Sequence, residues 1–233
     1  MLSLVLIPGL AASDAMWQSQ LRALSPWRPQ VTDVHMRHPG IEAMAGALLR
    51  EHEGELVLCG ASMGGMVAME AARQAPGRVR GLALLGTNAQ PENAGMRALR
   101  EAAIELFAQG RVREVIEPNI AFAFHPDNAP ALAQAYLDLV LGAGADQLIA
   151  QNRAVIARPD ARVHLPMLKC PVLVMCGDSD QLTPPECSRE IAALVPHAEL
   201  HIVGKCGHML TMERPEVVNA TLTRWLTDLS LRA

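Results

Sequence analysis

Residues 56–72 read LVLCGASMGGMVAMEAA: a short apolar run, a G-x-S-x-G motif at residues 60–64 and an apolar helical pattern follow one another. Strand, sharp turn and helix are the context in which this motif carries a nucleophile. The turn forces Ser62 into a strained backbone conformation, and Cβ atoms at Gly60 and Gly64 would collide with neighbouring backbone. Ser62 then lies above the sheet at a helix N-terminus, where partial positive charge favours a developing anion. The stretch therefore predicts a nucleophilic Ser62, with a merely structural glycine-rich turn as the alternative.

Short apolar runs bounded by glycine and proline alternate with longer amphipathic stretches on both sides of this motif, which is typical of βαβ units. Residues 4–7 and 172–175 are continuously apolar, as expected for strands buried on both faces of a sheet. We therefore expect an α/β fold in which a mostly parallel sheet of about six strands is flanked by helices. The expected strands are residues 2–7, 30–35, 56–60, 81–85, 172–176 and 199–203, and the expected helices are residues 14–24, 40–52, 63–75, 186–195 and 214–230.

Residues 91–168 interrupt this alternation, because no strand pattern returns until Pro171. The segment is rich in helix-forming residues and predicts a helical lid inserted into a core made of residues 1–90 and 169–233. Such an insertion is expected over the carboxyl edge of the sheet, where open α/β sheets bind ligands. Glycines and prolines are expected to break the segment into about four short helices. These residues are Gly110, Pro118, Pro126, Pro130, Gly142 and Gly144.

A serine hydroxyl needs a base, and the base needs an orienting carboxylate. Asp178 and Asp180 follow the strand expected at residues 172–176, and His208 follows the one expected at residues 199–203. Both loops therefore reach the sheet edge that carries Ser62. Other histidines are weaker candidates for the base or the pocket: His35 and His38 also follow an expected strand, and His125 lies in the insertion.

Composition excludes several classes of protein. The 233-residue chain has 20 Lys and Arg against 24 Asp and Glu, a net charge of −4, and no basic stripe, so nucleic acid is not an expected partner. No apolar run approaches the roughly 20 residues that span a bilayer. The apolar start resembles a signal peptide, but no Lys or Arg precedes Arg22, which favours a buried strand.

The cysteines predict neither disulfides nor a metal site. Their number is five, none shows C-x-x-C spacing, and reduced thiols in a cytoplasmic protein are the simplest interpretation. Cys206 and His208 could begin a zinc site, but no second pair with ligand spacing accompanies them.

These motifs together resemble the α/β-hydrolase superfamily, specifically its small cofactor-free serine hydrolases with a helical lid. The resemblance covers nearly the whole chain, and its matching stretches are residues 6–10 with Trp17, residues 59–65 with 75–79, residues 170–184, and residues 207–208 with 213–216. It implies that no metal or organic cofactor is used. In that family the acid ends a G-x-x-D motif, which is Asp180 here, with Asp178 as the alternative. The resemblance also implies that the backbone N–H groups of Leu10 and Met63 form the oxyanion hole.

Two departures from the family alter what is expected. The chain begins where many members have their third strand, so a sheet of about six strands instead of eight is expected. The loop at residues 34–40 lacks the usual glycine-rich turn, which leaves the pocket shape on that side open.

The predicted reaction is acyl transfer through Ser62 on a small or medium carboxylic ester or lactone, with His208 as base and Asp180 as its orienting acid. The same triad also supports acyl transfer to alcohols, perhydrolysis, carbon–carbon bond hydrolysis or cleavage of short peptides. A ligand-binding receptor without turnover is a minor alternative, and no pattern indicates an oligomeric state. Candidate pocket residues, each with core packing as the alternative, are Trp17, Phe107, Phe122, Phe124, His125 and Tyr136; Arg153 and Arg158 are candidate carboxylate-binding residues.

Overall fold

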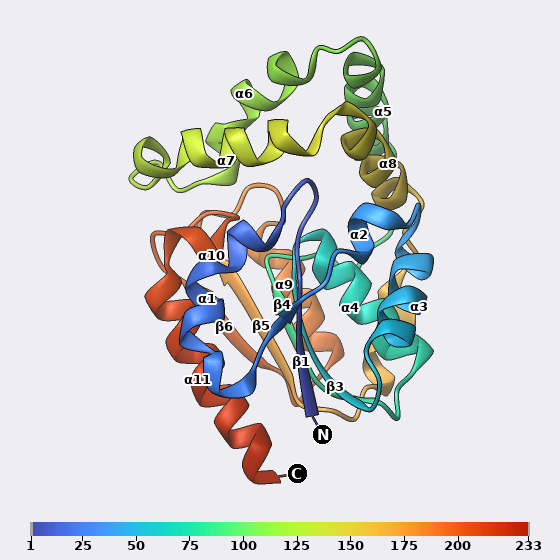
Figure 1. The fold of residues 1–233 in the computed structure, drawn as a ribbon, viewed down its shortest axis with the longest axis vertical. Coiled ribbons are helices and arrows are strands. Elements are labelled where there is room, and N and C mark those ends of the chain that lie inside the picture. Colours follow the sequence, from blue (N-terminus) through green and yellow to red (C-terminus); the bar gives the residue numbers. More distant parts are fainter. Residues whose placement is uncertain (1, 233) are drawn as a thin grey trace.

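A computed structural model describes residues 2–232 of the chain. Within that range six strands form one sheet in the order β2-β1-β3-β4-β5-β6, and every adjacent pair is parallel (Figure 1). The strands are β1 (Leu2–Ile7), β2 (Gln30–Val31), β3 (Glu55–Ala61), β4 (Val79–Leu85), β5 (Val172–Gly177) and β6 (Glu199–Val203). The expected parallel α/β sheet is confirmed.

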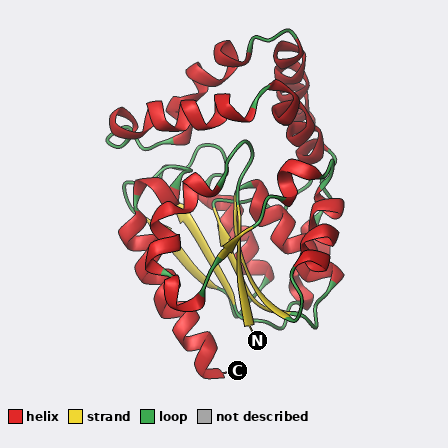
Figure 2. Ribbon diagram, in the orientation of Figure 1, coloured by secondary structure: helices red, strands yellow, loops and turns green. Residues whose placement is uncertain are grey.

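Helices cover both faces of the sheet. Alternate side chains of each strand point to opposite sides, so a strand that is apolar throughout contributes to a core on each face. Val5 and Ile7 belong to one core cluster, whereas Leu4 and Leu6 belong to another. The first cluster is closed by α3 (Ile41–Glu51), α4 (Met63–Gln74) and α9 (Pro185–Leu194), and the second by α1 (Gln18–Ala23) and α11 (Pro215–Arg232). Figure 2 shows the strands between these two helical layers.

The strand expected at residues 30–35 is wrong beyond Val31. The Thr32 hydroxyl accepts the N–H of Val34, and the N–H of His38 donates to the carbonyl of Val34, so the chain turns into α2 (Val34–Arg37). Local side-chain bonds of this kind compete with a sheet ladder. The remaining short elements are α10 (Leu210–Glu213) and 3₁₀ turns at Asp14–Trp17, Ser25–Trp27, Ala161–Val163 and Leu165–Met167.

Residues 91–168, all of them described, contain the four expected α-helices: α5 (Ala94–Ala108), α6 (Val112–Ala123), α7 (Ala129–Ala143) and α8 (Ala145–Ile156). They lie beyond the carboxyl ends of the strands (Figure 1). Two expected breakers do not end a helix. Pro118 lies inside α6, whose Ile120 and Ala123 are buried, so packing outweighs the lost hydrogen bond. Gly142 lies inside α7, which ends at Ala143 and is followed by Gly144 with φ +82°.

The order of the strands places two loops side by side at the carboxyl edge. The chain leaves β1 toward β2 on one side and then returns to form β3 on the other side. Ligands of open α/β sheets bind where the direction of winding reverses in this way. The loop after β1 and the turn after β3, which carries Ser62, flank that point. Among residues 2–232, no helix combines the length and apolar character needed to cross a membrane.

Candidate active site

Ser62 stands on a strained turn between β3 and α4. Its φ of +53° and ψ of −119° lie outside the regions that side chains favour, and its N–H donates to the Leu85 carbonyl at 2.9 Å. A Cβ atom on Gly64 would overlap the carbonyl oxygen of Ile7, and one on Gly60 would overlap the backbone of Gly64. The two glycines are therefore required for the close approach that holds the turn.

Thr87 supports the same turn, although no sequence pattern singled it out. It is fully buried, and its hydroxyl donates to the carbonyl of Ser62 at 2.7 Å. A Cβ atom on Gly65 would lie 2.6 Å from the Thr87 Oγ1 atom, so this side chain is pressed against the first turn of α4. Ser62 itself remains partly exposed at the helix N-terminus, as a nucleophile must be.

Asp180 and His208 meet at the ends of β5 and β6. The Nδ1 atom of His208 lies 2.9 Å from Oδ2 of Asp180, and the two residues are 8% and 3% exposed. Burial acts to raise the pKa of Asp180, but the adjacent His208 and the donors from Thr183 outweigh it and lower the pKa below its ordinary value of 3.8. Asp180 is therefore a carboxylate at neutral pH, and it accepts the Nδ1–H of the imidazole.

Thr183 is a further member of this cluster. Its hydroxyl donates to Oδ2 of Asp180 at 2.9 Å and lies 3.3 Å from Nδ1 of His208. The N–H groups of Leu182 and Thr183 both donate to Oδ1 of Asp180 at 2.9 Å. The carboxylate is thus fixed in orientation by the turn that follows it.

Asp178, the alternative acid, does not contact His208 in any hydrogen bond among the described residues. Its carboxylate accepts the N–H of Lys205 at 3.0 Å and that of Cys206 at 3.2 Å, so it holds the loop that carries His208. The geometry thus favours Asp180 over Asp178 as the partner of the imidazole.

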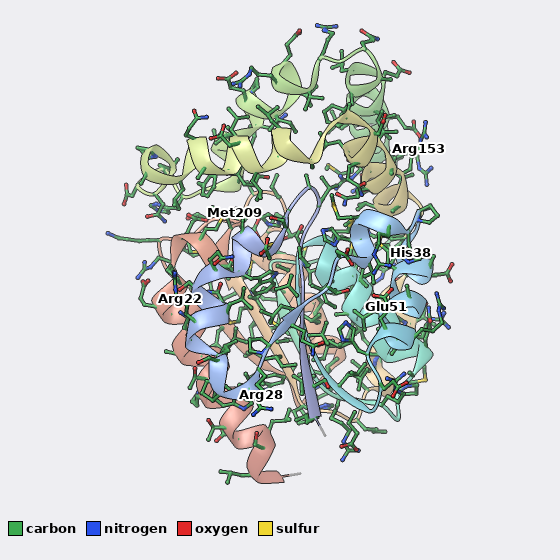
Figure 3. The ribbon with its side chains drawn as sticks, in the orientation of Figure 1. Arg22, Arg28, His38, Glu51, Arg153 and Met209 are labelled. Atoms are coloured by element: carbon green, nitrogen blue, oxygen red, sulfur yellow. The ribbon has the colours of Figure 1, made fainter. Side chains whose placement is uncertain are left out.

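The other candidate histidines have different partners. The Nε2 atom of His35 lies 2.8 Å from the carbonyl of Ala12, and the Nδ1 atom of His125 accepts the N–H of Asp127 at 3.1 Å. His38 lies at the outer side of α2 and α3 (Figure 3). Among residues 2–232, none of the three is hydrogen-bonded to Ser62 or Asp180.

The loop after β1 passes directly beside Ser62. A Cβ atom on Gly9 would lie 3.2 Å from the Cβ of Ser62 and 3.9 Å from its Oγ. Within residues 2–232, the N–H groups of Leu10 and Met63 donate to no protein acceptor. Two unpaired backbone donors therefore flank the turn, which is the arrangement that an oxyanion hole requires.

Glu213 binds the backbone on both sides of His208. No sequence pattern assigned this role, although Glu213 lies in one of the matching stretches. Its Oε1 atom accepts the N–H of Gly207 at 2.9 Å and that of Met209 at 3.2 Å. Its Oε2 atom accepts the N–H of His125 at 2.8 Å and the amide of Asn128 at 2.9 Å.

The same loop bonds directly to the helical insertion. The N–H of His208 donates to the carbonyl of Ala123, the last residue of α6, at 2.9 Å. Met209 lies immediately below the insertion (Figure 3). The position of His208 therefore depends on residues 91–168 as well as on the sheet.

Three of the candidate pocket residues are corrected to packing positions. Trp17, Phe124 and Phe107 are 0%, 1% and 2% exposed, and a ring without accessible surface cannot line an open pocket in this conformation. Phe124 packs edge-on against Tyr136 with ring centroids 5.3 Å apart. Phe122 is 45% exposed, whereas His125 and Tyr136 are partly buried.

Neither candidate carboxylate-binding arginine has a free guanidinium near Ser62. Arg153 is exposed and lies at the outer side of the insertion (Figure 3). Arg158 is buried and pairs with Glu92 at 2.9 Å. The described residues also contain no group of three or more His, Cys, Asp or Glu side chains suited to hold a metal ion.

Comparison with known proteins places this geometry in a family. A family model described as serine aminopeptidase, S33, matches residues 28–215, a range that includes Ser62, Asp180 and His208. The chain belongs to this family of hydrolases. The resemblance to α/β-hydrolases that the sequence motifs indicated is therefore confirmed.

Similar proteins point to the same class of enzyme. The hydrolase is 29% identical over 249 positions to the pimeloyl-[acyl-carrier protein] methyl ester esterase of Aromatoleum aromaticum, covering 91% of this chain and 93% of that protein. It superposes on a malate-bound thermophilic esterase from Thermogutta terrifontis with a TM-score of 0.89 and 28% identity, covering 98% of this chain and 90% of that one. The enol-lactonase from Burkholderia xenovorans LB400 shares the fold at a TM-score of 0.87 and 22% identity, covering 97% of this chain and 92% of that one. The predicted class, a hydrolase of ester bonds, is confirmed.

Proposed function

We propose that this hydrolase cleaves small or medium carboxylic esters or lactones through an acyl-enzyme on Ser62. The observation that carries the proposal is the 2.9 Å hydrogen bond between Nδ1 of His208 and Asp180, at the same carboxyl edge of the sheet as the strained serine turn. Because that bond keeps the proton on Nδ1, the Nε2 atom of His208 is free to act as a base.

The proposed reaction has two halves. His208 removes the hydroxyl proton of Ser62 as Oγ attacks the carbonyl carbon, and the N–H groups of Leu10 and Met63 stabilise the oxyanion. The imidazolium then protonates the departing alcohol, which leaves an acyl group on Ser62. A water molecule, deprotonated by His208, attacks this ester, and the acid and the free serine are released.

The proposed substrate class follows from the relatives and from the insertion. Proteins with the same fold act on a methyl ester and on an enol-lactone, which supports an acyl substrate with a small leaving group or a ring. We assign residues 91–168 the role of a lid over the acyl site, and the bond from His208 to Ala123 supports that role. The five free cysteines support a reducing compartment, the cytoplasm.

The direct test is release of p-nitrophenol from acyl esters of increasing chain length. We expect turnover that Ser62→Ala abolishes and that the control Ser179→Ala retains, since among the described residues the Ser179 hydroxyl donates a hydrogen bond only to Asp178. The chain length that gives the highest kcat/KM would measure the acyl site. Equal rates for the native protein and Ser62→Ala would contradict the proposal.

A second candidate, cleavage of short peptides from their N-terminus, is favoured by the description of the matching family model. The same triad would then form an acyl-enzyme from an amide. Aminoacyl p-nitroanilides, offered beside the matching p-nitrophenyl esters, separate the two. Preference for the anilide would replace the esterase proposal, whereas hydrolysis of the ester alone would support it.

A further inference from the structure

The loop that carries Leu10 is fastened by a side chain from the helical insertion. Oε1 of Gln151, in α8, accepts the N–H of Ala11 at 2.6 Å. Gln151 is 0% exposed and lies 140 residues from its partner in the sequence. Because an unpaired N–H is costly in a buried site, this bond is a determinant of where the loop lies.

The loop needs such support because its backbone is strained. Ala11 has a φ of +56°, a region that favours glycine, and the N–H of Ala12 donates to the carbonyl of Gly9 at 3.2 Å to close a tight turn. A residue held in this conformation persists only where its surroundings fix it. Gly9, at the start of the turn, lies so near Ser62 that an added Cβ would be 3.2 Å from the Ser62 Cβ, so any relaxation of the turn shifts the backbone beside Ser62.

The other end of Gln151 completes a closed ring of hydrogen bonds. Its Nε2 atom donates to the carbonyl of His35 at 3.0 Å, and the Nε2 of His35 donates to the carbonyl of Ala12 at 2.8 Å. Burial lowers the pKa of His35, so the imidazole is neutral and Nε2 carries its proton toward that carbonyl. The two partners fix the amide of Gln151 in one orientation, because the reverse orientation would bring donor against donor and acceptor against acceptor.

We propose that Gln151 is a positioning residue for acyl transfer: it couples the docked insertion to the loop that presents the Leu10 N–H to the oxyanion. The inference rests on the proposed function. Gln151 contacts neither Ser62 nor His208 among the described residues, and it acts only through the loop. A correctly placed insertion is thereby a condition for a correctly formed oxyanion hole.

Gln147 provides a matched control one turn earlier in α8. Its Nε2 atom also donates to the carbonyl of His35, at 3.1 Å, but among the described residues it makes no bond to the loop after β1. Replacing either glutamine by methionine keeps the side-chain length and removes the bond to His35. Only Gln151→Met also removes the bond to Ala11, together with a 3.4 Å contact to Sδ of Met36.

The test compares Gln151→Met, Gln147→Met and the native protein in kcat, in KM and in inhibition by a trifluoromethyl ketone, which forms an oxyanion on a catalytic serine. We expect Gln151→Met to lower kcat at least about tenfold with KM changed less than about twofold, since the oxyanion contact exists only in the transition state. The inhibition constant of the trifluoromethyl ketone should rise by a similar factor. Gln147→Met should match the native protein in all three.

A folded Gln151→Met with kcat and inhibition equal to those of Gln147→Met would overturn the inference, as would an effect confined to KM. If Gln151→Met does not fold, Gln151→Asn carries the same test, because its shorter amide cannot reach both partners. Ser62→Ala, assayed alongside, separates this inference from the proposed function. Ester hydrolysis by Ser62→Ala at the native rate contradicts the proposed function itself, whatever the glutamine variants do.

Discussion

Asp180 is a buried carboxylate whose charge is stabilised by its neighbours. Hydrogen bonds from His208, from the Thr183 hydroxyl and from the N–H groups of Leu182 and Thr183 offset the cost of burial. Because the pKa of Asp180 is lowered, its stabilising contribution is fully present above its ordinary pKa of 3.8 and disappears only as the pH falls below that value. The residue therefore remains an anion throughout the neutral range.

Replacing this carboxylate tests the geometry. Asp180→Asn should lower kcat by about 10⁴-fold, because an amide facing Nδ1 favours the wrong tautomer of His208. Asp178→Asn, two residues away, should lower kcat less than about tenfold, since its side chain bonds only to the loop backbone and to Ser179. Steady-state kinetics on one p-nitrophenyl ester measures both. Equal losses in the two variants would contradict the assignment of Asp180.

At this scale the sequence predicted the residues that a local pattern identifies. Ser62 was recognisable from the glycines around it, and His208 and Asp180 from strand ends in the order serine, acid, histidine. Gln151 and Thr87 were not, because each acts on a backbone group far away in the chain: Gln151 lies 140 residues from Ala11, and no spacing records such a contact. Thr183 and Glu213 lie close to the triad in sequence, but only the folded loops reveal which donors they meet.

The serine turn between β3 and α4 is the element that fixes the position of Ser62. Gly64→Ala should lower the free energy of unfolding by about 3 kcal/mol or more, because its Cβ would overlap the carbonyl of Ile7. Gly77→Ala, where a Cβ meets nothing within 4 Å, should change stability by less than about 1 kcal/mol. Urea denaturation followed by circular dichroism gives both values. A Gly64→Ala protein as stable as Gly77→Ala would be inconsistent with the close approach described.

The loop between β6 and α10 carries His208, and hydrogen bonds to Glu213 hold that loop in place. Glu213→Gln places an amide NH₂ where a carboxylate oxygen now accepts two donors, so we expect a loss of about 1 to 3 kcal/mol in stability. A displaced His208 should also lower kcat about tenfold or more. Glu216→Gln, whose side chain is 65% exposed, should change stability by less than about 0.5 kcal/mol. Thermal unfolding and ester kinetics on both variants check this, and matching values would argue against the role of Glu213.

Elements were predictable from hydrophobic period wherever one face or both faces are buried. The buried strands β1, β3, β4 and β5, the edge strand β6 and the helices α3, α4, α9 and α11 lie within about two residues of expectation. Helix α1 begins four residues later than expected, because a 3₁₀ turn occupies Asp14–Trp17. The length of the edge strand β2 was not predicted correctly, because Thr32 and Asp33 supply local bonds that favour the helical turn α2. The prediction that Pro118 breaks a helix was also wrong, because the packing of α6 outweighs the local preference of proline against helix.

At the scale of the whole molecule, several hydrogen bonds fasten the insertion to the core. Gln151 bonds to the loop after β1, Ala123 to His208, and both His125 and Asn128 to Glu213. Glu92 and Arg158 pair within the insertion and join its two ends. The side chains of Glu92 and Arg158 are 4% and 5% exposed, and Arg100 also donates to Glu92 at 2.6 Å. The bonds of Gln151 and Ala123 therefore fix residues 91–168 relative to the loops that carry Leu10 and His208.

The Glu92 cluster predicts a pH-dependent contribution to stability. Burial acts to raise the pKa of Glu92, but Arg158 and Arg100 outweigh it, so the pKa lies below the ordinary 4.5. The ion pair thus stabilises the protein above about pH 4.5, and its contribution is lost as the pH falls through the lowered pKa. We expect Glu92→Gln to cost about 3 to 5 kcal/mol at pH 7, and the difference from the native protein to shrink below pH 4.5.

Glu101→Gln is the control for this prediction, because that side chain is 58% exposed and lies 3.9 Å from Arg97. It should cost less than about 0.5 kcal/mol at either pH. Denaturation at pH 7 and at pH 4 measures all three proteins. A Glu92→Gln penalty that is absent at pH 7, or that grows in acid, would contradict the account of the cluster.

The central claim, a serine nucleophile activated by His208, is tested most directly by locating a fluorophosphonate adduct with peptide mass spectrometry. The account predicts one adduct, on Ser62, that forms at least about 100-fold more slowly in His208→Gln. An adduct on another residue, no adduct at all, or an unchanged rate in His208→Gln would contradict it.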